Sequence, residues 1–272
     1  MTSAPAKAAD TGQSRRPVSN PIVIIPSRLA SVRLPRKPLA DIGGQPMIVQ
    51  VWRRAAEADI GPVLVACAEP EIADAVRAAG GTAILTRPEH PSGSDRIAEA
   101  LQAADPVGRH DAVVNMQGDL PTMAPAALRA ALAALADPAV DIGTVVTRIT
   151  SDAERDNPNV VKAAVAFDER MMARNQPVGR ALYFSRLPVL SGEGPHYHHI
   201  GIYAYRRAAL ERFVALPPAP LEKRERLEQL RALDAGMRID AALVDLVPLG
   251  VDTPADLERA RAILAGKNPT SN

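Results

Sequence analysis

Residues 21–52 read PIVIIPSRLASVRLPRKPLADIGGQPMIVQVW. The apolar run Ile22–Ile25 predicts a short buried strand, and a long polar loop follows it. A helix is predicted to begin near Pro46, with one apolar face formed by Met47, Ile48, Val51, Trp52 and Ala55. A buried strand, a loop and an amphipathic helix in this order are typical of the first unit of an α/β domain.

The same alternation continues along the chain and predicts a mostly parallel sheet. The next strands are expected at 63–66, 82–86 and 112–116, with a helix at 69–79 and another that starts at a capping box formed by Ser92 and Asp95. A helix at 126–136 and strands at 142–149 and 160–167 follow. Beyond them, 168–190 is expected to be irregular, 198–205 an antiparallel strand, 221–235 one charged helix, 241–247 a strand and 254–264 the last helix. We therefore expect one domain over 21–264 with an inserted lobe at about 155–210, a flexible leader at 1–20 and a tail at 265–272.

Composition excludes several classes of protein. Lys and Arg number 32 and Asp and Glu 31, a net charge of +1, which argues against a nucleic-acid binder that works by bulk charge. The one cysteine, Cys67, excludes an internal disulfide and a multi-cysteine zinc site, and its apolar surroundings predict a buried strand residue. No apolar stretch reaches the roughly 18 residues that a membrane span needs, and the first 20 residues lack a signal-peptide core. A cytoplasmic enzyme is the expectation.

The first loop concentrates positive charge directly after the first strand. It carries Arg28, Arg33, Arg36 and Lys37. In open α/β sheets the carboxyl ends of the strands face the ligand crevice, where Arg and Lys neutralise phosphates. The loop lacks the glycine patterns of a Walker loop or a dinucleotide fingerprint. The sequence therefore predicts an anion site whose contacts come mainly from side chains.

Two aspartates are candidates for a metal site. Asp119 follows a predicted strand in NMQGDLP (115–121), and Asp252 precedes a helix in GVDTPAD (250–256), where Thr253 is the expected cap. Each alone is also a common turn or cap residue. Two carboxylates opposite Arg28, Arg33 and Lys37 would suit a Mg²⁺–triphosphate complex, because Mg²⁺ takes one or two carboxylates, water and phosphate oxygens.

Eight ordered motifs span about 21–264: IIPSRLASVRLPRKPL, LTRPEHPSGSDRIAE, VNMQGDLP, NPNVVK, ALYFSR, HHIGIYAYR, PLEKRERLEQLR and GVDTPADLERAR. On these motifs the chain resembles the 3-deoxy-manno-octulosonate cytidylyltransferases. The resemblance implies a nucleotidyltransferase fold of the glycosyltransferase-A-like type with a dimerisation lobe, and a homodimer. It also implies Mg²⁺ as cofactor and the conversion of CTP and 3-deoxy-D-manno-octulosonate (Kdo) to CMP-Kdo and pyrophosphate, which activates Kdo for lipopolysaccharide biosynthesis. Nucleic acid and membrane are not expected partners.

The resemblance also implies roles for individual residues. Arg28 and Lys37 match triphosphate-binding cations, with Arg33 in the same stretch, and Asp119 and Asp252 match metal-binding carboxylates. The remaining nucleotide-binding positions are His90, Ser92, Arg96 and Gln117. The implied sugar-binding positions are Tyr183, Ser185, Arg186, His199, Tyr203, Glu228 and Gln229. Arg28, Lys37, Asp119 and Asp252 are the expected catalytic group, with the anomeric hydroxyl of Kdo attacking the α-phosphorus of CTP in line.

Other interpretations of these residues stay open at this point. Glu228 and Gln229 could be the solvated face of a helix, and Tyr183 could belong to the core of the lobe or a subunit interface. His196, His198 and His199 lack the partner spacing of a zinc site. Leu120 follows Asp119 where a second acid is common in the family, which leaves the charge near the metal open. A sialic-acid cytidylyltransferase and an inactive nucleotide-sugar sensor remain as rival functions.

Overall fold

The computed structural model describes residues 17–31, 33–167, 169–172, 176–246 and 248–266. Its strands are β1 Pro21–Ser27, β2 Asp41–Ile42, β3 Gln45–Pro46, β4 Val63–Cys67, β5 Thr82–Leu85, β6 Ala112–Asn115, β7 Ile142–Arg148, β8 Lys162–Ala166, β9 Val178–Ser185, β10 Tyr197–Arg206 and β11 Ile239–Leu243. Its helices are the 3-10 helix η1 Lys37–Leu39, α1 Met47–Ala56, α2 Pro70–Ala78, α3 Gly93–Ala104, α4 Pro125–Ala133, α5 Asp152–Asp156, α6 Glu169–Met172, α7 Arg207–Ala215, α8 Pro220–Glu225, α9 Gln229–Asp234 and α10 Pro254–Leu264. The predicted leader and tail lie mostly outside the described residues.

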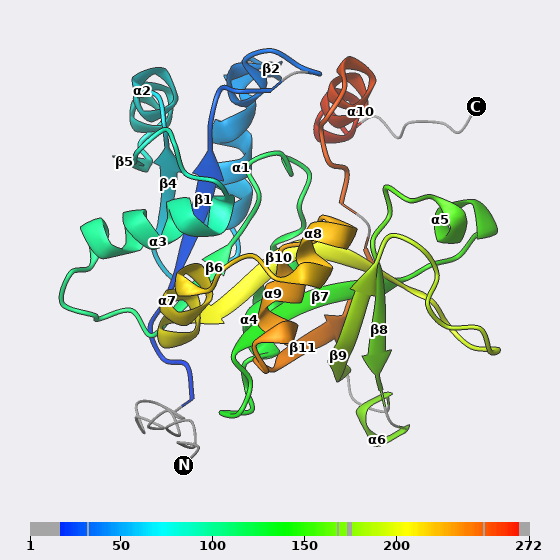
Figure 1. The fold of residues 1–272 in the computed structure, drawn as a ribbon. Coiled ribbons are helices and arrows are strands. Elements are labelled where there is room, and N and C mark those ends of the chain that lie inside the picture. Colours follow the sequence, from blue (N-terminus) through cyan, green and yellow to red (C-terminus); the bar gives the residue numbers. More distant parts are fainter. Residues whose placement is uncertain (1–16, 32, 168, 173–175, 247, 267–272) are drawn as a thin grey trace.

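One mixed sheet of nine strands crosses the molecule in the order β5-β4-β1-β6-β10-β7-β11-β9-β8 (Figure 1). The first four strands are parallel, as predicted, and so are β7 and β11. The prediction of a mostly parallel sheet is wrong for the other half, because β10 runs antiparallel to β6, β7 and β8, and β9 runs antiparallel to β8 and β11. The antiparallel pairing predicted for 198–205 is confirmed.

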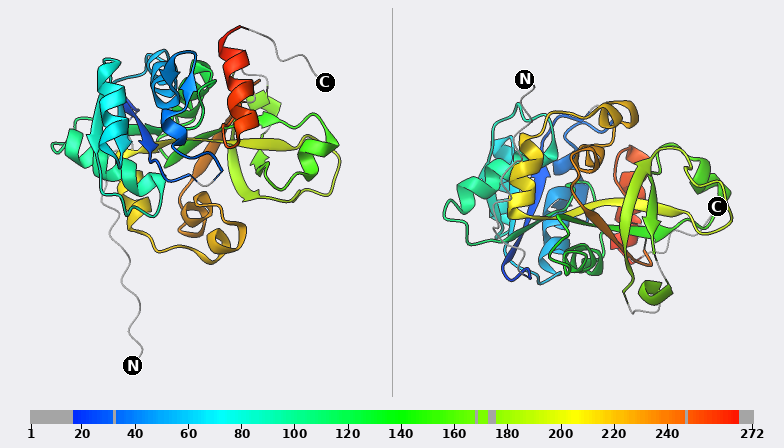
Figure 2. Two further views of the ribbon diagram at one scale, coloured as in Figure 1. Left: turned by 90° about the horizontal axis from the view of Figure 1, so that it is seen from above. Right: turned by 60° about the horizontal axis from the view of Figure 1, so that its bottom comes forward.

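Helices cover both faces of this sheet, as the two views of Figure 2 show. Strand β1 illustrates the arrangement, since Val23 and Ile25 join one apolar core while Ile22 and Ile24 join the other. Side chains alternate along a strand, so β1 must supply both cores. Helices α1, α2, α4 and α10 pack on the first core and α3, α7 and α9 on the second. Cys67 is buried on β4, as predicted.

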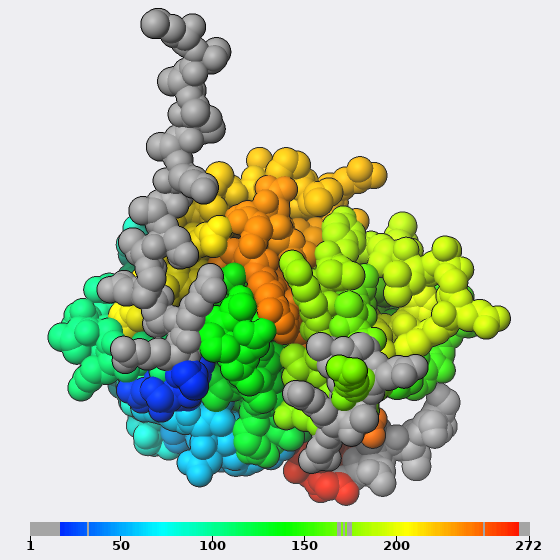
Figure 3. Space-filling view, turned by 90° about the horizontal axis from the view of Figure 1, so that it is seen from below, coloured from blue at the N-terminus to red at the C-terminus, as the bar shows by residue number. Residues whose placement is uncertain are grey.

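The half of the sheet that carries β8 and β9 extends away from the parallel half (Figure 1). Seen from below, the orange segment that contains β11 lies between a green surface and the yellow-green surface of the β9 region (Figure 3). This agrees with the strand order, in which β11 lies between β7 and β9. The prediction of an irregular segment over 168–190 is wrong for β9, a strand in which Arg180 and Leu182 are exposed. Its pairing with β8 and β11 decides its structure. Strand β10 joins the two halves in the middle of the sheet.

The charged segment predicted as one helix over 221–235 is two helices. Arg226 adopts a left-handed conformation with φ of 56° and ends α8, and α9 begins three residues later. The last helix has the predicted bounds, with Thr253 and Asp256 forming a capping box. Among the described residues, the structure has no helix with the length and apolar character that crossing a membrane requires.

Candidate active site

Lys37 joins the two predicted acids. Its Nζ lies 3.0 Å from Oδ2 of Asp119 and 3.1 Å from Oδ1 of Asp252. Lys37 opens η1, Asp119 follows β6, and Asp252 precedes α10, so three separate segments meet at one nitrogen atom. Burial opposes the charge of Lys37, but its ion pairs and hydrogen bonds with both carboxylates outweigh that effect and raise its pKa above the usual value. The two carboxylates therefore share one cation.

Arg33 lies at the rim of this group. Its guanidinium is 3.0 Å from Oδ2 of Asp252, and its side chain is 64% exposed against 15% for Lys37. An ion pair this exposed contributes little to stability. Arg33 and Asp252 thus lie beside the cavity described next, while Lys37 and Asp119 line it.

A cavity of about 310 Å³ opens at the carboxyl ends of β1 and β6. Seven of the predicted site residues line it: Arg28, Lys37, His90, Ser92, Arg96, Gln117 and Asp119. Sequence reasoning did not single out Ser27, Ser31, Gly93 and Gly118, which line it as well. At Gly118 a Cβ atom would lie 2.7 Å from the backbone oxygen of Pro26, so the close approach of the two strand ends requires glycine there.

The wall formed by the start of α3 is held by a dense set of hydrogen bonds. Ser92 caps the helix as predicted, accepting a hydrogen bond from the backbone nitrogen of Asp95. Arg96 is 2% exposed, and it donates to Thr86 Oγ1 at 2.6 Å and to the carbonyl of Arg87. Burial lowers the pKa of Arg96. This cation is fixed in place at the cavity wall.

A second polar group is buried between β7 and β10. Nε2 of His199 lies 3.0 Å from Thr144 Oγ1, and the Thr144 hydroxyl donates to the carbonyl of Ile202 at 2.8 Å. That hydroxyl has one hydrogen, so it accepts from the Nε2–H of His199. Burial lowers the pKa of His199 to about 3, which keeps the ring neutral. The ring centroid of Tyr203 lies 5.4 Å away, and burial raises the pKa of its phenol.

Glu228 links this region to the start of α3. Its Oε2 accepts a hydrogen bond of 2.9 Å from Ser94, a contact that sequence reasoning missed. Within the described residues, Oε1 of Glu228 and Nε2 of Gln229 are buried without a hydrogen-bond partner. The interpretation of this pair as a solvated helix face is wrong for Gln229, which is 5% exposed, whereas the Glu228 side chain is 32% exposed and only partly buried. Burial raises the pKa of Glu228.

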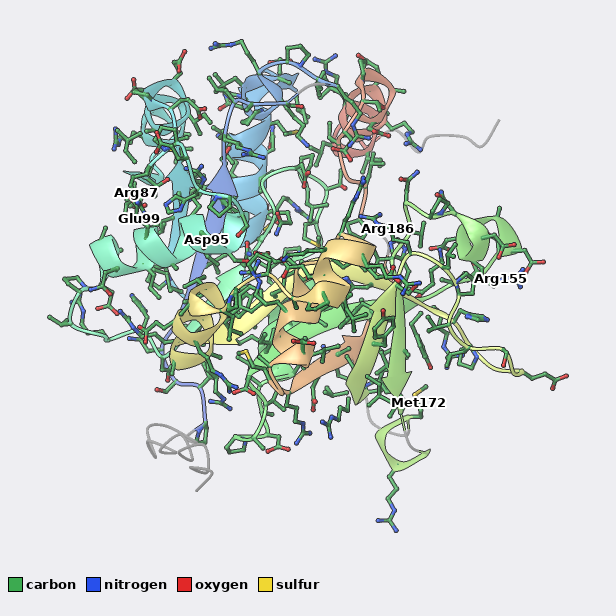
Figure 4. All side chains as sticks on the ribbon, in the orientation of Figure 1. Arg87, Asp95, Glu99, Arg155, Met172 and Arg186 are labelled. Carbon is green, nitrogen blue, oxygen red and sulfur yellow. The ribbon has the colours of Figure 1, made fainter. Side chains whose placement is uncertain are left out.

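The other predicted sugar-side residues have structural contacts instead. Arg186 donates to the carbonyls of Glu225 and Pro158, and Ser185 Oγ lies 3.4 Å from the Glu225 carboxylate. Figure 4 shows Arg186 near the end of β9, beside α8. Tyr183 is partly buried against the second core. None of these residues is among those that line the cavity.

The donor set near Lys37 suits a hard cation. In the part of the chain that the structure describes, no group of three or more His, Cys, Asp or Glu side chains could hold a metal ion. Asp119 and Asp252 supply two carboxylates, and they already contact one cation, the Lys37 ammonium. Two carboxylates with open positions fit Mg²⁺ that is also held by phosphate oxygens. Leu120 is 8% exposed and packs in the first core, so an apolar residue follows Asp119 without facing this group.

The parallel strand ends and the cation-rich cavity define an α/β protein with an anion-binding crevice. A family model described as "Cytidylyltransferase" matches residues 22–239, and the chain belongs to this family. It is 64% identical to the 3-deoxy-manno-octulosonate cytidylyltransferase of Paramagnetospirillum magneticum over 244 residues, which cover 90% of this chain and 97% of the relative. It is 62% identical to the protein of the same name from Rhodospirillum rubrum, over 97% of this chain and all of that relative.

Solved structures agree with this assignment. A CMP:2-keto-3-deoxy-manno-octonic acid synthetase complexed with CTP superimposes with a TM-score of 0.81 at 38% identity, covering 91% of this chain and 99% of that one. A nucleotidyl transferase from Methanothermobacter thermautotroptrophicus matches with a TM-score of 0.56 at 14% identity, a likeness of fold alone.

Proposed function

We propose that this protein transfers a cytidylyl group from CTP to Kdo, giving CMP-Kdo and pyrophosphate and so activating Kdo for lipopolysaccharide biosynthesis. The proposal rests on the convergence of Lys37, Asp119 and Asp252 at the mouth of the cavity that holds Arg28 and Arg96. Relatives at 62–64% identity carry the name of this activity, and the similar solved structure holds CTP. The site geometry and the relatives together favour CTP and Kdo as the two substrates.

In this proposal the cavity binds CTP and the opening loop holds its phosphates. Arg28 and Lys37 neutralise the triphosphate, and Arg33 adds charge at the rim. Gln117, His90, Ser92 and Arg96 surround the cytidine. Asp119 and Asp252 would hold Mg²⁺, which when bound orients the α-phosphate and offsets charge on its oxygens. Lys37 is then free to move from the acids to the phosphates that leave.

The acceptor would lie on the Glu228 side of the cavity. The anomeric hydroxyl oxygen of Kdo attacks the α-phosphorus and releases its proton to water, the bond from the α-phosphorus to the oxygen that bridges to the β-phosphate breaks, and pyrophosphate leaves. His199, Tyr203, Glu228 and Gln229 are proposed to bind the sugar, a role supported by one polar atom of Glu228 and one of Gln229 that are buried without a hydrogen-bond partner among the described residues. Catalysis comes mainly from positioning and charge stabilisation, so no covalent enzyme intermediate is needed.

A pyrophosphate-release assay tests this function. We expect turnover only when CTP, Kdo and Mg²⁺ are all present, with UTP and ATP poor donors. Consumption of a sialic acid in place of Kdo would assign the rival cytidylyltransferase activity. CTP binding without pyrophosphate release under any of these conditions would leave the sensor as the function.

The assembly and location belong to the same proposal. We expect a cytoplasmic homodimer formed through the region of β8 and β9, where Leu182, Leu187, Val189 and Leu190 are exposed. Four exposed large apolar residues in one segment suit a protein interface. Light scattering of the purified protein should give twice the chain mass of 28.9 kDa, and Leu182→Glu with Leu187→Glu should give the monomer.

A further inference from the structure

His90 lies between two hollows of the surface. It lines the cavity of about 310 Å³, and it also lines a groove on the outer side of α3 together with Arg87 and Glu99. Glu99 belongs to the groove and is not among the residues that line the cavity. The imidazole ring therefore separates Glu99 from the bound nucleotide expected in the cavity.

The groups around the Glu99 carboxylate decide whether His90 or Glu99 donates the hydrogen bond between them. The backbone nitrogen of Arg87 donates to Oε1 of Glu99 at 3.2 Å, and Nε of Arg87 donates to Oε2 at 3.1 Å. Figure 4 shows the labelled Arg87 and Glu99 next to each other at α3. Burial raises the pKa of Glu99, but the hydrogen bonds from His90 and Arg87 outweigh that effect and lower its pKa below the usual value. Glu99 is thus an ionised acceptor.

An ionised carboxylate can only accept hydrogen bonds, so His90 must donate to it from Nε2, the atom in contact with Glu99. A neutral imidazole carries one hydrogen, and placing it on Nε2 makes Nδ1 an acceptor. The described residues offer Nδ1 no hydrogen-bond partner. The acceptor is left for a ligand in the cavity that His90 lines.

We propose that Glu99 is a positioning residue which fixes the Nε2–H tautomer of His90, so that Nδ1 accepts a hydrogen bond from the exocyclic amino group of cytosine and selects CTP over UTP. Cytosine presents a donor at this position, whereas uracil presents a carbonyl oxygen. A site whose acceptor meets another acceptor leaves both unpaired, which is how buried polar groups reject close analogues. This inference rests on the proposed function, because it assumes that the cavity holds the nucleotide base.

Replacing Glu99 by glutamine tests the tautomer. The amide of Glu99→Gln can donate to Nε2 of His90, which permits the Nδ1–H form and presents a donor to uracil. We expect the ratio of kcat/KM for CTP to that for UTP to fall about tenfold, since one hydrogen bond is lost for one base and gained for the other. Glu89→Gln is the matched control, because Glu89 is exposed on the same loop and loses the same charge. Glu89→Gln should keep the native ratio of kcat/KM for CTP to that for UTP. Glu99→Asp, which keeps the carboxylate, should have a ratio closer to the native one than Glu99→Gln has.

Nitrogen-15 NMR of the histidine side chains supplies a readout that a purely structural role would not change. The chain has five histidines, and the signal missing in His90→Gln assigns His90. The native protein should show hydrogen on Nε2 and a bare Nδ1, and Glu99→Gln should show hydrogen moving to Nδ1. A native ring with hydrogen on Nδ1, or a charged ring, overturns the proposal even when the variant fails to fold.

The two possible failures are distinguishable in one set of assays. A native protein that releases no pyrophosphate from CTP and Kdo contradicts the proposed function. A native protein that is active, with a Glu99→Gln variant that loses CTP and UTP turnover equally and keeps its tautomer, contradicts the role of Glu99 and leaves the function intact.

Discussion

The charged cluster around Lys37 and the buried cluster around His199 hold polar groups in opposite ways. Lys37, Asp119 and Asp252 satisfy one another through ion pairs at a partly open cavity mouth. His199 is buried within the sheet and Tyr203 is partly buried beside it, both packed against aromatic rings, and desolvation drives both toward their neutral forms. The first cluster can exchange partners when an anion arrives, whereas the second is fixed before any ligand binds.

This difference follows from where the residues sit in the fold. The charged cluster comes from loops at the ends of parallel strands, where side chains face a crevice. The buried cluster comes from the interior of β10, a strand paired on both sides. Loop charges can be screened by water or a ligand, while strand groups must be satisfied by the protein itself.

The largest effect is expected at the charged cluster. Asp119→Asn removes one charge that would hold Mg²⁺, and we expect kcat to fall by about 10²–10³-fold, with unfolding little changed. The measurement is pyrophosphate release at saturating Mg²⁺ and CTP. Asp74→Asn, which removes a charge 74% exposed on α2, is the control and should keep full activity. Near-native kcat in Asp119→Asn would contradict the metal site.

The buried cluster should instead control stability with pH. The folded pKa of His199 is about 3 against 6.5 for a free histidine, so the unfolded chain binds a proton first as the pH falls. Its stabilising contribution is complete above pH 6.5 and is lost between pH 6.5 and 3. Between pH 7 and 5, the native protein should lose about 2 kcal/mol more unfolding free energy than His199→Gln.

Urea unfolding at several pH values measures this loss. His196→Gln, outside the apolar cores, serves as the comparison and should follow the native pH dependence. Equal slopes for the native protein and His199→Gln would show that His199 is not buried in its neutral form.

Glu228, which accepts a hydrogen bond from Ser94 at the start of α3, should separate binding of the two substrates. Glu228→Gln keeps the shape of the side chain but removes its charge, so we expect KM for Kdo to rise about tenfold while KM for CTP stays within about twofold. Initial rates with each substrate varied in turn provide the measurement. A rise confined to KM for CTP would assign Glu228 to the nucleotide, through Ser94.

The smallest effect is expected at the rim. Arg33→Ala breaks an ion pair between two side chains that are 64% and 47% exposed, so kcat/KM should fall about threefold or less. Lys37→Met, tested in parallel, should cost far more because Lys37 lies between both acids. Equal losses in the two variants would remove the distinction between rim and cavity.

Much of the parallel half could be predicted from sequence because its signals are local. The run Ile22–Ile25, the Ser92 cap and the Thr253 cap each specify an element within a few residues. Strand ends in such a sheet share one edge, so Asp119 could be predicted to lie near the opening loop. The structure brings these residues together, while their catalytic roles stay predictions.

The antiparallel half was predicted only in part, because strands near β7, β8, β10 and β11 were expected but β9 was not. Strand β9 has exposed residues in alternation and becomes a strand through pairing with β8 and β11. The break between α8 and α9 depends on Arg226, a residue other than glycine in the left-handed conformation, and Gln229 after it is buried.

The sequence by itself determined the order of strands and helices in the first half, the helix caps, the charged residues of the opening loop and the family. The elements, caps and loop charges depend on neighbours within one or two turns of chain, and the family depends on the order of short motifs along it. Only the tertiary structure decided which residues share a partner: Lys37 with two acids, Glu228 with Ser94, and His90 with Glu99. The contacts of Lys37 and Glu228 join segments far apart in the sequence, and His90 meets Glu99 across the turn into α3. Their energies depend on burial and on distances that no local pattern contains.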